Sequence, residues 1–275
     1  MKRHPQRVVC LTEETTEILY RIGAGDLVVG VSGYTVRPPE ARKKPKVSAF
    51  ISADVPKIEA LEPDLILAFS DLQADIVREL LRRGHTVVGF NQRSLEEILQ
   101  VVRMVGALVG RAKESDALAD ELEANLARVK ILGEKLPRRP RVFFEEWDEP
   151  LISGIEWVSE LVEIAGGEDV FPEMRTRHDG PGRVVTQAAV LERKPDVILA
   201  SWCGKKVRPE RIAAREGWKA IPAVANDRIH EIKSPLILQP GPAALTDGLE
   251  QCHALIAAAA RGEPAPRFAR GARRA

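Results

Sequence analysis

Short apolar runs alternate with amphipathic segments through the first third of the chain. The run at 8–11 predicts a buried strand. Thr12, followed by Glu13 and Glu14, predicts the N-cap and acidic first turn of a helix that ends at Gly23. The alternation continues as a strand at 28–31, a Pro-rich loop at 38–45, a helix at 54–61, a strand at 65–69, a helix at 72–83 and a strand at 86–90. Strands that alternate with helices predict βα units around a parallel sheet.

The pattern becomes helical from Ser94, which forms a predicted capping box with Glu97. Apolar residues then recur at helical spacing until Pro137 and Pro140 end the stretch. Alternation resumes as a strand at 141–145, a helix at 157–165, a helix capped by Thr186, a strand at 196–201, a helix at 209–218, a strand at 228–232 and a helix at 243–260. The chain therefore has two α/β regions separated by a helical one.

We predict an α/β protein with two Rossmann-like lobes, a long helical connector and a ligand cleft between the lobes. The predicted parts are an N-terminal α/β lobe at 5–93, the connector at 94–137, a C-terminal α/β lobe at 138–260 and a basic flexible tail at 261–275. The sequence EPDLILA at 62–68 returns as KPDVILA at 194–200, as expected if each lobe contains the same unit. Chance recurrence of a common α/β connection is the alternative.

Composition and charge narrow the class of protein. Hydrophobic residues make up 44% of the chain and charged residues 29%, which excludes a disordered or fibrous chain. The formal net charge of +1 gives no field that favours nucleic acid or an anionic membrane, so we expect no nucleic-acid partner. No run approaches the roughly 18 apolar residues of a membrane-spanning helix, so we expect no transmembrane segment.

The N-terminus and the cysteines bear on location. Residues 1–11 hold three basic residues and then only four apolar ones, which is not the pattern of a secretory signal peptide. The three cysteines are far apart and form no C-x-x-C motif, which is typical of a reducing compartment. We expect a cytoplasmic protein from the sequence as it stands, and a periplasmic or extracellular one if an export signal has been removed.

Few residues are arranged for catalysis. The sequence has no Walker A, G-x-G-x-x-G or G-x-S-x-G motif, and its five histidines are not at metal-ligand spacing. We therefore expect no built-in metal or cofactor. An enzyme acting on a metal-tetrapyrrole is the alternative of another class, and it would use His178, Cys203 and the carboxylates at 145–149. A solvated histidine, an inert cysteine and a solvated strand end explain the same features structurally.

Aromatic residues are concentrated just after predicted strands, where ligands of open α/β sheets bind. Flat rings on such loops suit a large, flat and partly apolar ligand, although rings that plug the top of each lobe are the alternative. The predicted ligand-binding residues are these aromatics together with one histidine in a Gly-rich loop and one glutamine after a strand: Tyr34, Phe50, Phe69, Trp147, Trp202, His178 and Gln239.

The chain resembles a known family over almost its whole length. The runs RVVCLT at 7–12, VGVSGY at 29–34, IEALEPDLIL at 58–67, SLEEI at 94–98 and GGEDVF at 166–171 resemble the substrate-binding proteins of cobalamin, siderophore and haem ABC importers, the class with a helical backbone between its lobes. The cobalamin-binding branch is the most similar. It too has a tyrosine after Val-Ser, an aromatic residue after the next Val-Ser and an aromatic residue after the Pro-Asp strand, at the positions of Tyr34, Phe50 and Phe69.

The resemblance implies binding without chemistry, with a cobalamin-like corrinoid as ligand, for ABC import or for intracellular handling. A siderophore, haem or other metal chelate is the alternative ligand. It also implies docking to an ABC permease through one acidic residue on each lobe. Asp75 matches the first, whereas the second position falls near Ala188 and Ala189. The second-lobe tryptophan of the cobalamin branch is replaced near Gly182, so Trp147, His178 and Trp202 would have to form the far wall.

Overall fold

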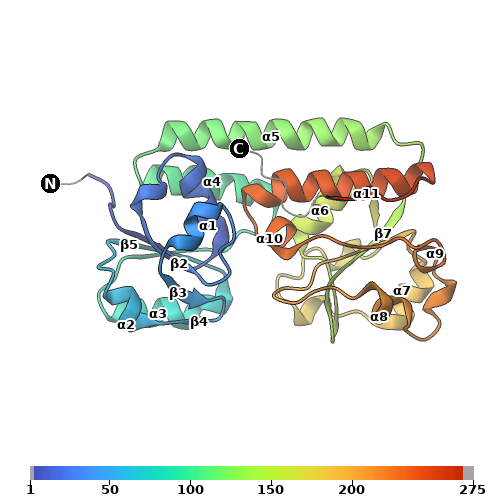
Figure 1. Cartoon of the computed structure of the whole chain (residues 1–275), viewed down its shortest axis with the longest axis horizontal. Coiled ribbons are helices and arrows are strands. Elements are labelled where there is room, and N and C mark those ends of the chain that lie inside the picture. The colour runs from blue at the N-terminus through green and yellow to red at the C-terminus, as the bar shows by residue number, and fades with distance from the viewer. Residues whose placement is uncertain (1–2, 269–275) are drawn as a thin grey trace. The chain divides into compact units, whose positions relative to one another are not determined.

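The computed structural model describes residues 3–268, and its contacts divide the chain into two compact units (Figure 1). The first unit comprises Met1–Ala124 and Gln239–Ala244, and the second comprises Asn125–Leu238 and Leu245–Ala275. The chain therefore passes from one unit to the other after Ala124, after Leu238 and after Ala244. The first of these points lies inside the long helix α5, Ala112–Glu134, rather than at the predicted lobe boundaries of 93 and 137.

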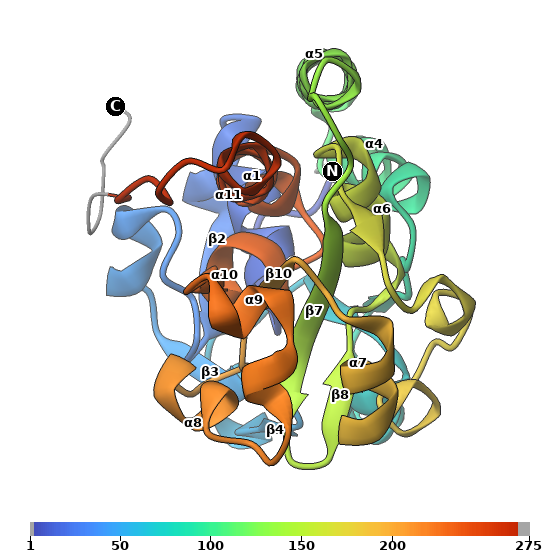
Figure 2. The same cartoon turned by 90° about the vertical axis from the view of Figure 1, so that its right-hand side faces the viewer.

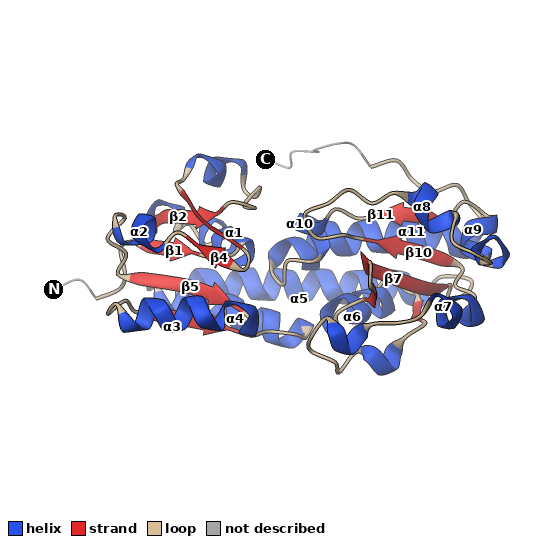
Figure 3. Ribbon diagram, turned by 90° about the horizontal axis from the view of Figure 1, so that it is seen from below, coloured by secondary structure: helices blue, strands red, loops and turns tan. Residues whose placement is uncertain are grey.

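The first unit contains a six-stranded sheet in the order β4-β3-β2-β1-β5-β6 (Figure 3). Only the short β3–β4 hairpin is antiparallel, and the other neighbours are parallel. Because β1 is central and wholly buried, its three residues are apolar on both faces. The strands are β1 (Val8–Cys10), β2 (Val28–Ser32), β3 (Lys46–Ala49), β4 (Ser52–Ala53), β5 (Leu65–Phe69) and β6 (Val87–Phe90).

Two pairs of helices cover the faces of this sheet (Figure 1). One face carries α1 (Glu13–Arg21) and α4 (Leu95–Leu108), which pack on each other, and the other carries α2 (Val55–Glu59) and α3 (Ala74–Arg82). The predicted capping box at the start of α4 is confirmed, because the Ser94 hydroxyl accepts the Glu97 N–H and the Glu97 carboxylate accepts the Ser94 N–H. The core on the α2 and α3 face joins strand and helix residues: Val9, Leu11, Ile58, Ile66 and Leu80.

The second unit contains a sheet in the order β11-β10-β7-β8, with β9 also paired to β7. Helices α6 (Glu156–Ile164) and α11 (Leu249–Arg261) lie on one face, and α7 (Gln187–Arg193), α8 (Pro209–Ala213) and α9 (Pro222–Ala225) lie on the other (Figure 2). A short helix α10 (Ser234–Ile237) follows the last strand. The strands are β7 (Arg141–Asp148), β8 (Leu151–Ser153), β9 (Glu168–Asp169), β10 (Val197–Ala200) and β11 (Ile229–Glu231). The prediction of two α/β lobes with parallel sheets is confirmed.

Several predicted elements need correction. The helix expected at 209–218 stops at Ala213, and Gly217 adopts the left-handed conformation (φ 75°) before a single 3-10 turn that contains Trp218. The helix expected at 243–260 begins as a π-helical turn, Ala244–Gly248, before α11. The hairpin of β3 and β4 was not predicted, because its strands are too short to leave an alternating pattern. The basic tail predicted at 261–275 lies outside the described residues from 269 onward.

Candidate ligand-binding site

Three of the predicted aromatic residues lie at the carboxyl edge of the first unit's sheet. Tyr34 follows β2 and is 49% exposed, Phe50 occupies the β3–β4 turn, and Phe69 ends β5. The rings of Phe50 and Phe69 are neighbours, with centroids 6.4 Å apart and planes inclined by 48°. Phe69 itself is buried, so it supports Phe50 rather than facing solvent. Strands from different parts of the sequence thus bring the predicted rings to one edge.

A glutamine that the sequence did not single out holds these two aromatic positions. Gln73 is fully buried, and its side-chain amide lies between two loops. Its Oε1 accepts the Phe69 N–H over 3.0 Å, while its Nε2 donates to the Phe50 carbonyl over 2.7 Å. Arg93 adds a guanidinium 5.3 Å from the Phe69 centroid and donates to Asp71 over 2.9 Å. A glutamine next to a helix start gives no sequence signal for such a role, because the contact depends on the tertiary fold.

The second unit holds the two predicted tryptophans, and both have intramolecular partners. Trp202 is buried after β10, and its Nε1 donates to the Glu145 carboxylate over 3.2 Å. Trp147 was predicted in a loop, but it lies within β7, because pairing with Ile152 of β8 extends that strand. The Lys205 ammonium lies 4.0 Å from the Trp147 centroid and 5.1 Å from that of Trp202, and it forms an ion pair with Asp148. Lys205 therefore covers part of the surface on which a ligand was expected to stack.

Three carboxylates of the acidic cluster at 145–149 form ion pairs, namely those of Glu145, Glu146 and Asp148. Glu145 is fully buried and makes a bidentate ion pair with Arg215, with N···O distances of 2.6 and 2.9 Å. Burial raises the pKa of Glu145, although the Arg215 and Trp202 hydrogen bonds oppose that rise. Glu146 makes a second bidentate pair, over 2.7 and 2.8 Å, with the buried Arg183. These carboxylates therefore act as structural anions, and general acid–base catalysis would require one of the pairs to open.

The remaining predicted residues are dispersed. His178 is exposed in the loop before α7, and Cys203 is an exposed thiol after β10. Gln239 is half-buried at the start of the segment Gln239–Ala244, which returns to the first unit. Within residues 3–268, His, Cys, Asp and Glu side chains form no group of three that could hold a metal ion.

Buried carboxyl groups at the start of α1 are a feature that the sequence analysis missed. Thr12 occupies the predicted N-cap, but its hydroxyl donates to Glu14 Oε1 over 2.5 Å instead of capping the helix. Burial raises the pKa of Glu14 to about 8 and that of Glu13 to about 7. Gly241 of the returning segment packs so closely on Glu14 that a Cβ at Gly241 would come within 2.7 Å of the Glu14 Cβ. The predicted N-cap position and acidic first turn are confirmed, but the returning segment covers the turn, which the sequence did not indicate.

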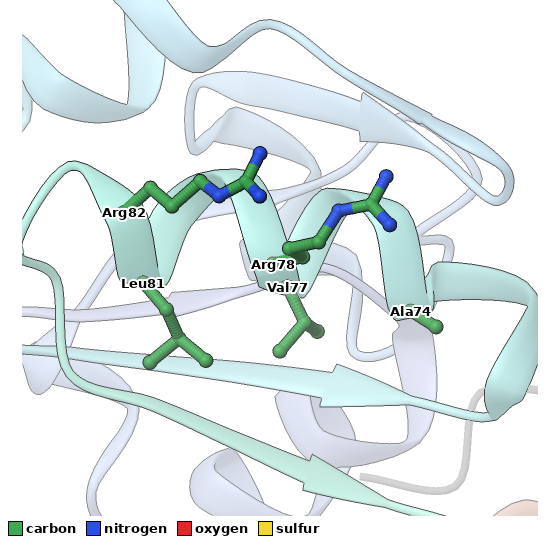
Figure 4. Close-up of a pocket in the computed structure, with 5 residues that line it drawn as sticks. All are labelled: Ala74, Val77, Arg78, Leu81 and Arg82. Carbon is green, nitrogen blue, oxygen red and sulfur yellow. The ribbon is translucent and has the colours of Figure 1, made fainter.

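Asp75, the predicted docking residue, lies in the first turn of α3 and is strongly exposed. Its carboxylate pairs with Arg78 over 2.8 Å, one turn along the same helix. A shallow hollow of about 520 Å³ runs along α3, with the arginines projecting from one side of the helix and the aliphatic side chains from the other (Figure 4). Its lining residues are Ala74, Val77, Arg78, Leu81 and Arg82.

The chain is similar over most of its length to known binding proteins. The model of a family described as periplasmic binding protein matches residues 8–236. An uncharacterized ABC transporter substrate-binding lipoprotein of Bacillus subtilis is 28% identical over 261 residues, which cover 91% of this chain and 80% of the relative. These matches do not support the predicted cytoplasmic location. Within the described residues, no helix combines the length and apolar character needed to cross a membrane.

Two solved structures share the fold over nearly the whole chain. A possible iron-binding (periplasmic solute-binding) protein of Staphylococcus epidermidis has a TM-score of 0.79 at 25% identity, and the match covers 92% of this chain and 99% of that one. The periplasmic vitamin B12-binding protein of Vibrio cholerae has a TM-score of 0.74 at 25% identity, with coverage of 93% and 98%. The two matches are similar in quality, so the likeness to them does not select one ligand.

Proposed function

The chain belongs to the periplasmic binding protein family, and from that premise we propose that it binds a cobalamin-like corrinoid, without altering it, for delivery to an ABC importer. The observation that carries the proposal is that Phe50, packed on the buried Phe69, and the exposed Tyr34 both follow strands at the carboxyl edge of one sheet. That edge is where open α/β sheets bind ligands.

The chemistry of this edge suits a flat macrocycle. Aromatic rings bind such a ligand by burial of apolar area and by offset stacking, neither of which requires a charge on the protein. Tyr34 adds a phenolic hydroxyl, which can donate to or accept from a polar group on the ligand rim. The similar vitamin B12-binding protein of Vibrio cholerae supports a corrinoid in this role.

The ion pairing of the carboxylates that an enzyme would use for proton transfer supports binding without chemistry. Glu145 and Glu146 are held in bidentate pairs with arginines, so they are not poised to transfer a proton to or from a ligand. The family is one of binding proteins, which supports the same conclusion at the family level.

Haem or another iron chelate is the second candidate ligand, favoured by the similar possible iron-binding protein of Staphylococcus epidermidis. Ring stacking accepts either macrocycle.

The proposed partner is the permease of an importer, outside the cytoplasm, in keeping with the Bacillus lipoprotein relative. Asp75 is the residue we propose for docking on the first unit, since its carboxylate is strongly exposed and pairs locally with Arg78. A permease surface rich in arginine would compete with that local pair.

Isothermal titration of the purified chain with cyanocobalamin, haemin and a ferric hydroxamate siderophore tests the proposal. We expect saturable binding of cyanocobalamin with one site per chain. Saturable binding of haemin alone would select the second candidate, and binding of the siderophore alone would overturn both tetrapyrrole assignments. Conversion of any ligand during incubation would contradict a role in binding alone.

A further inference from the structure

Two aliphatic side chains beside the aromatic pair are strongly exposed. Ile51, in the β3–β4 turn, is 71% exposed, and Leu72, just after β5, is 60% exposed. These are the two largest exposures among the large hydrophobic side chains of residues 3–268. Both residues are next in sequence to members of the Phe50–Gln73 contact. Their exposure therefore falls at the candidate site rather than at a random place on the surface.

The backbone segments that carry Ile51 and Leu72 are held in place by a hydrogen bond. Gln73 Nε2 donates to the Phe50 carbonyl over 2.7 Å, so the segment carrying Ile51 is tied to the segment carrying Leu72. The bond is buried on the Gln73 side, where water cannot compete with it. An apolar side chain on a fixed segment loses little further backbone freedom when a ligand covers it.

The turn that presents Leu72 is also strained. Ser70 has φ 69° and ψ 160°, a backbone conformation that is essentially restricted to glycine. Three hydrogen bonds maintain it: Ser70 N–H to the Phe90 carbonyl over 2.7 Å, Leu72 N–H to the Ser70 hydroxyl over 3.1 Å, and Gln73 N–H to the Ser70 carbonyl over 3.1 Å. Strain that the surroundings enforce is concentrated at ligand clamps and active sites. The strained turn is thus an observation independent of the exposed side chains.

We infer that Ile51 and Leu72 are ligand contacts, that Gln73 is the residue that positions them, and that the ligand has an alkyl-substituted rim. This inference rests on the proposed function. The Gln73 amide is turned inward and bonds to backbone, whereas the Asp71 carboxylate is 66% exposed next to Leu72 although it pairs with Arg93. The surface formed by Ile51 and Leu72 is therefore aliphatic, with one carboxylate at its edge. It suits the methyl groups on the edge of a tetrapyrrole ring, and its aliphatic side chains give no hydrogen bond to the oxygens of a hydroxamate chelate.

Serine variants test the two contacts without disturbing a core. Ile51→Ser and Leu72→Ser should each weaken binding of the tetrapyrrole that the wild-type chain binds by about 5- to 20-fold, with the melting temperature unchanged. Met104→Ser is the matched control, because Met104 is 51% exposed on α4 of the same unit, and it should bind like the wild type.

Gln73→Met tests the positioning role by removing both side-chain hydrogen bonds at nearly constant volume. It should weaken binding by a similar factor. Adding Ile51→Ser to it should then cause much less than the 5- to 20-fold loss expected in the wild-type background, because Ile51 would no longer be held in place. A residue with a merely structural role would instead give additive losses.

The outcomes of these experiments distinguish failure of the proposed function from failure of the inference about Ile51, Leu72 and Gln73. If the wild-type chain binds no tetrapyrrole, the proposed function is wrong and this inference falls with it. If the wild type binds and both serine variants bind equally well, the proposed function stands and this inference is overturned. Unchanged ligand binding combined with impaired permease-dependent uptake would also overturn it, because the exposed side chains would then contact a protein.

Discussion

Asn125 Nδ2 donates a hydrogen bond to the Leu245 carbonyl oxygen over 2.7 Å, and the two residues are 120 positions apart. Each is the first residue of the second unit after a crossing of the chain, Asn125 within α5 and Leu245 within the π-helical turn. A π-turn widens the helical ladder, and the Asn125 amide supplies a donor to a carbonyl within it. The Asn125 side chain therefore links the two points at which the chain enters the second unit.

Asn125→Asp separates the two bonds of this side chain. Aspartate still accepts the Arg128 guanidinium, which now lies 2.7 Å from Asn125 Oδ1, but it cannot donate to Leu245. We expect the free energy of unfolding to fall by about 1–3 kcal/mol. Urea titration followed by tryptophan fluorescence measures this directly, since all four tryptophans belong to the second unit. A loss no larger than that of Arg128→Met would show that the Leu245 bond contributes nothing.

Tyr34→Ala should affect binding rather than stability. The ring is 49% exposed, so its removal creates no cavity, and a loss of about 5- to 50-fold in ligand affinity is expected if it is a binding anchor. Trp157→Ala is the contrast, because that ring is buried and its Nε1 donates to the Ile237 carbonyl over 3.0 Å. It should lower the free energy of unfolding by about 3–5 kcal/mol. Calorimetry with and without ligand distinguishes the two, and an early-melting Tyr34→Ala that binds normally would contradict the site.

Stability should decrease with rising pH because of Glu14. Its pKa is about 8 in the folded chain, against an ordinary value of 4.5. Below pH 4.5 both states keep the proton. Between pH 4.5 and about 8 only the folded state keeps it, so the free energy of unfolding falls as pH rises, by at most about 1.4 kcal/mol per pH unit for one proton.

Glu14→Gln tests this dependence. Glutamine keeps an oxygen for the Thr12 hydroxyl and has no charge to bury, so the variant should be more stable than the wild type at pH 8 and less dependent on pH. Urea unfolding at one-unit steps from pH 5 to 9 gives the profile. Glu96→Gln, at an exposed position of α4, should retain the wild-type slope. The same slope in the Glu14→Gln profile would show that Glu14 is ionised in the folded chain.

Arg215→Met should be strongly destabilising, because it leaves the buried Glu145 without its guanidinium. Breaking a buried pair in this way costs about 3–5 kcal/mol at neutral pH. The deficit should shrink as the pH is lowered, because burial raises the pKa of Glu145 and its protonation removes the unpaired charge. Arg208→Met, at an exposed ion pair 3.8 Å long, is the control and should be nearly neutral. A deficit that does not change with pH would mean that packing, not charge, is responsible.

The alternation of strands and helices was predictable because the central strands are apolar runs buried on both faces, as β1, β5 and β10 show. The rings at strand ends were predictable for the same reason, since a strand's end fixes where the next side chain emerges. Gln73, Arg215 and Glu14 were not predictable. Each takes its role from a partner on another element: Phe50 lies 23 residues from Gln73, Glu145 lies 70 residues from Arg215, and Gly241 covers Glu14. The early end of α8 was not predictable either. Beyond Ala213, Arg215 and Trp218 contact each other and their surroundings instead of continuing the helix.

Equilibrium dialysis of the wild-type chain against cyanocobalamin, followed by mass analysis of the ligand recovered after denaturation, tests the central claim most directly. We expect retention of one ligand per chain at micromolar concentration and recovery of that ligand with its mass unchanged. We also expect haemin to compete, because both macrocycles would stack on the same rings. No retention of either tetrapyrrole, or recovery of a chemically altered one, would contradict the central claim.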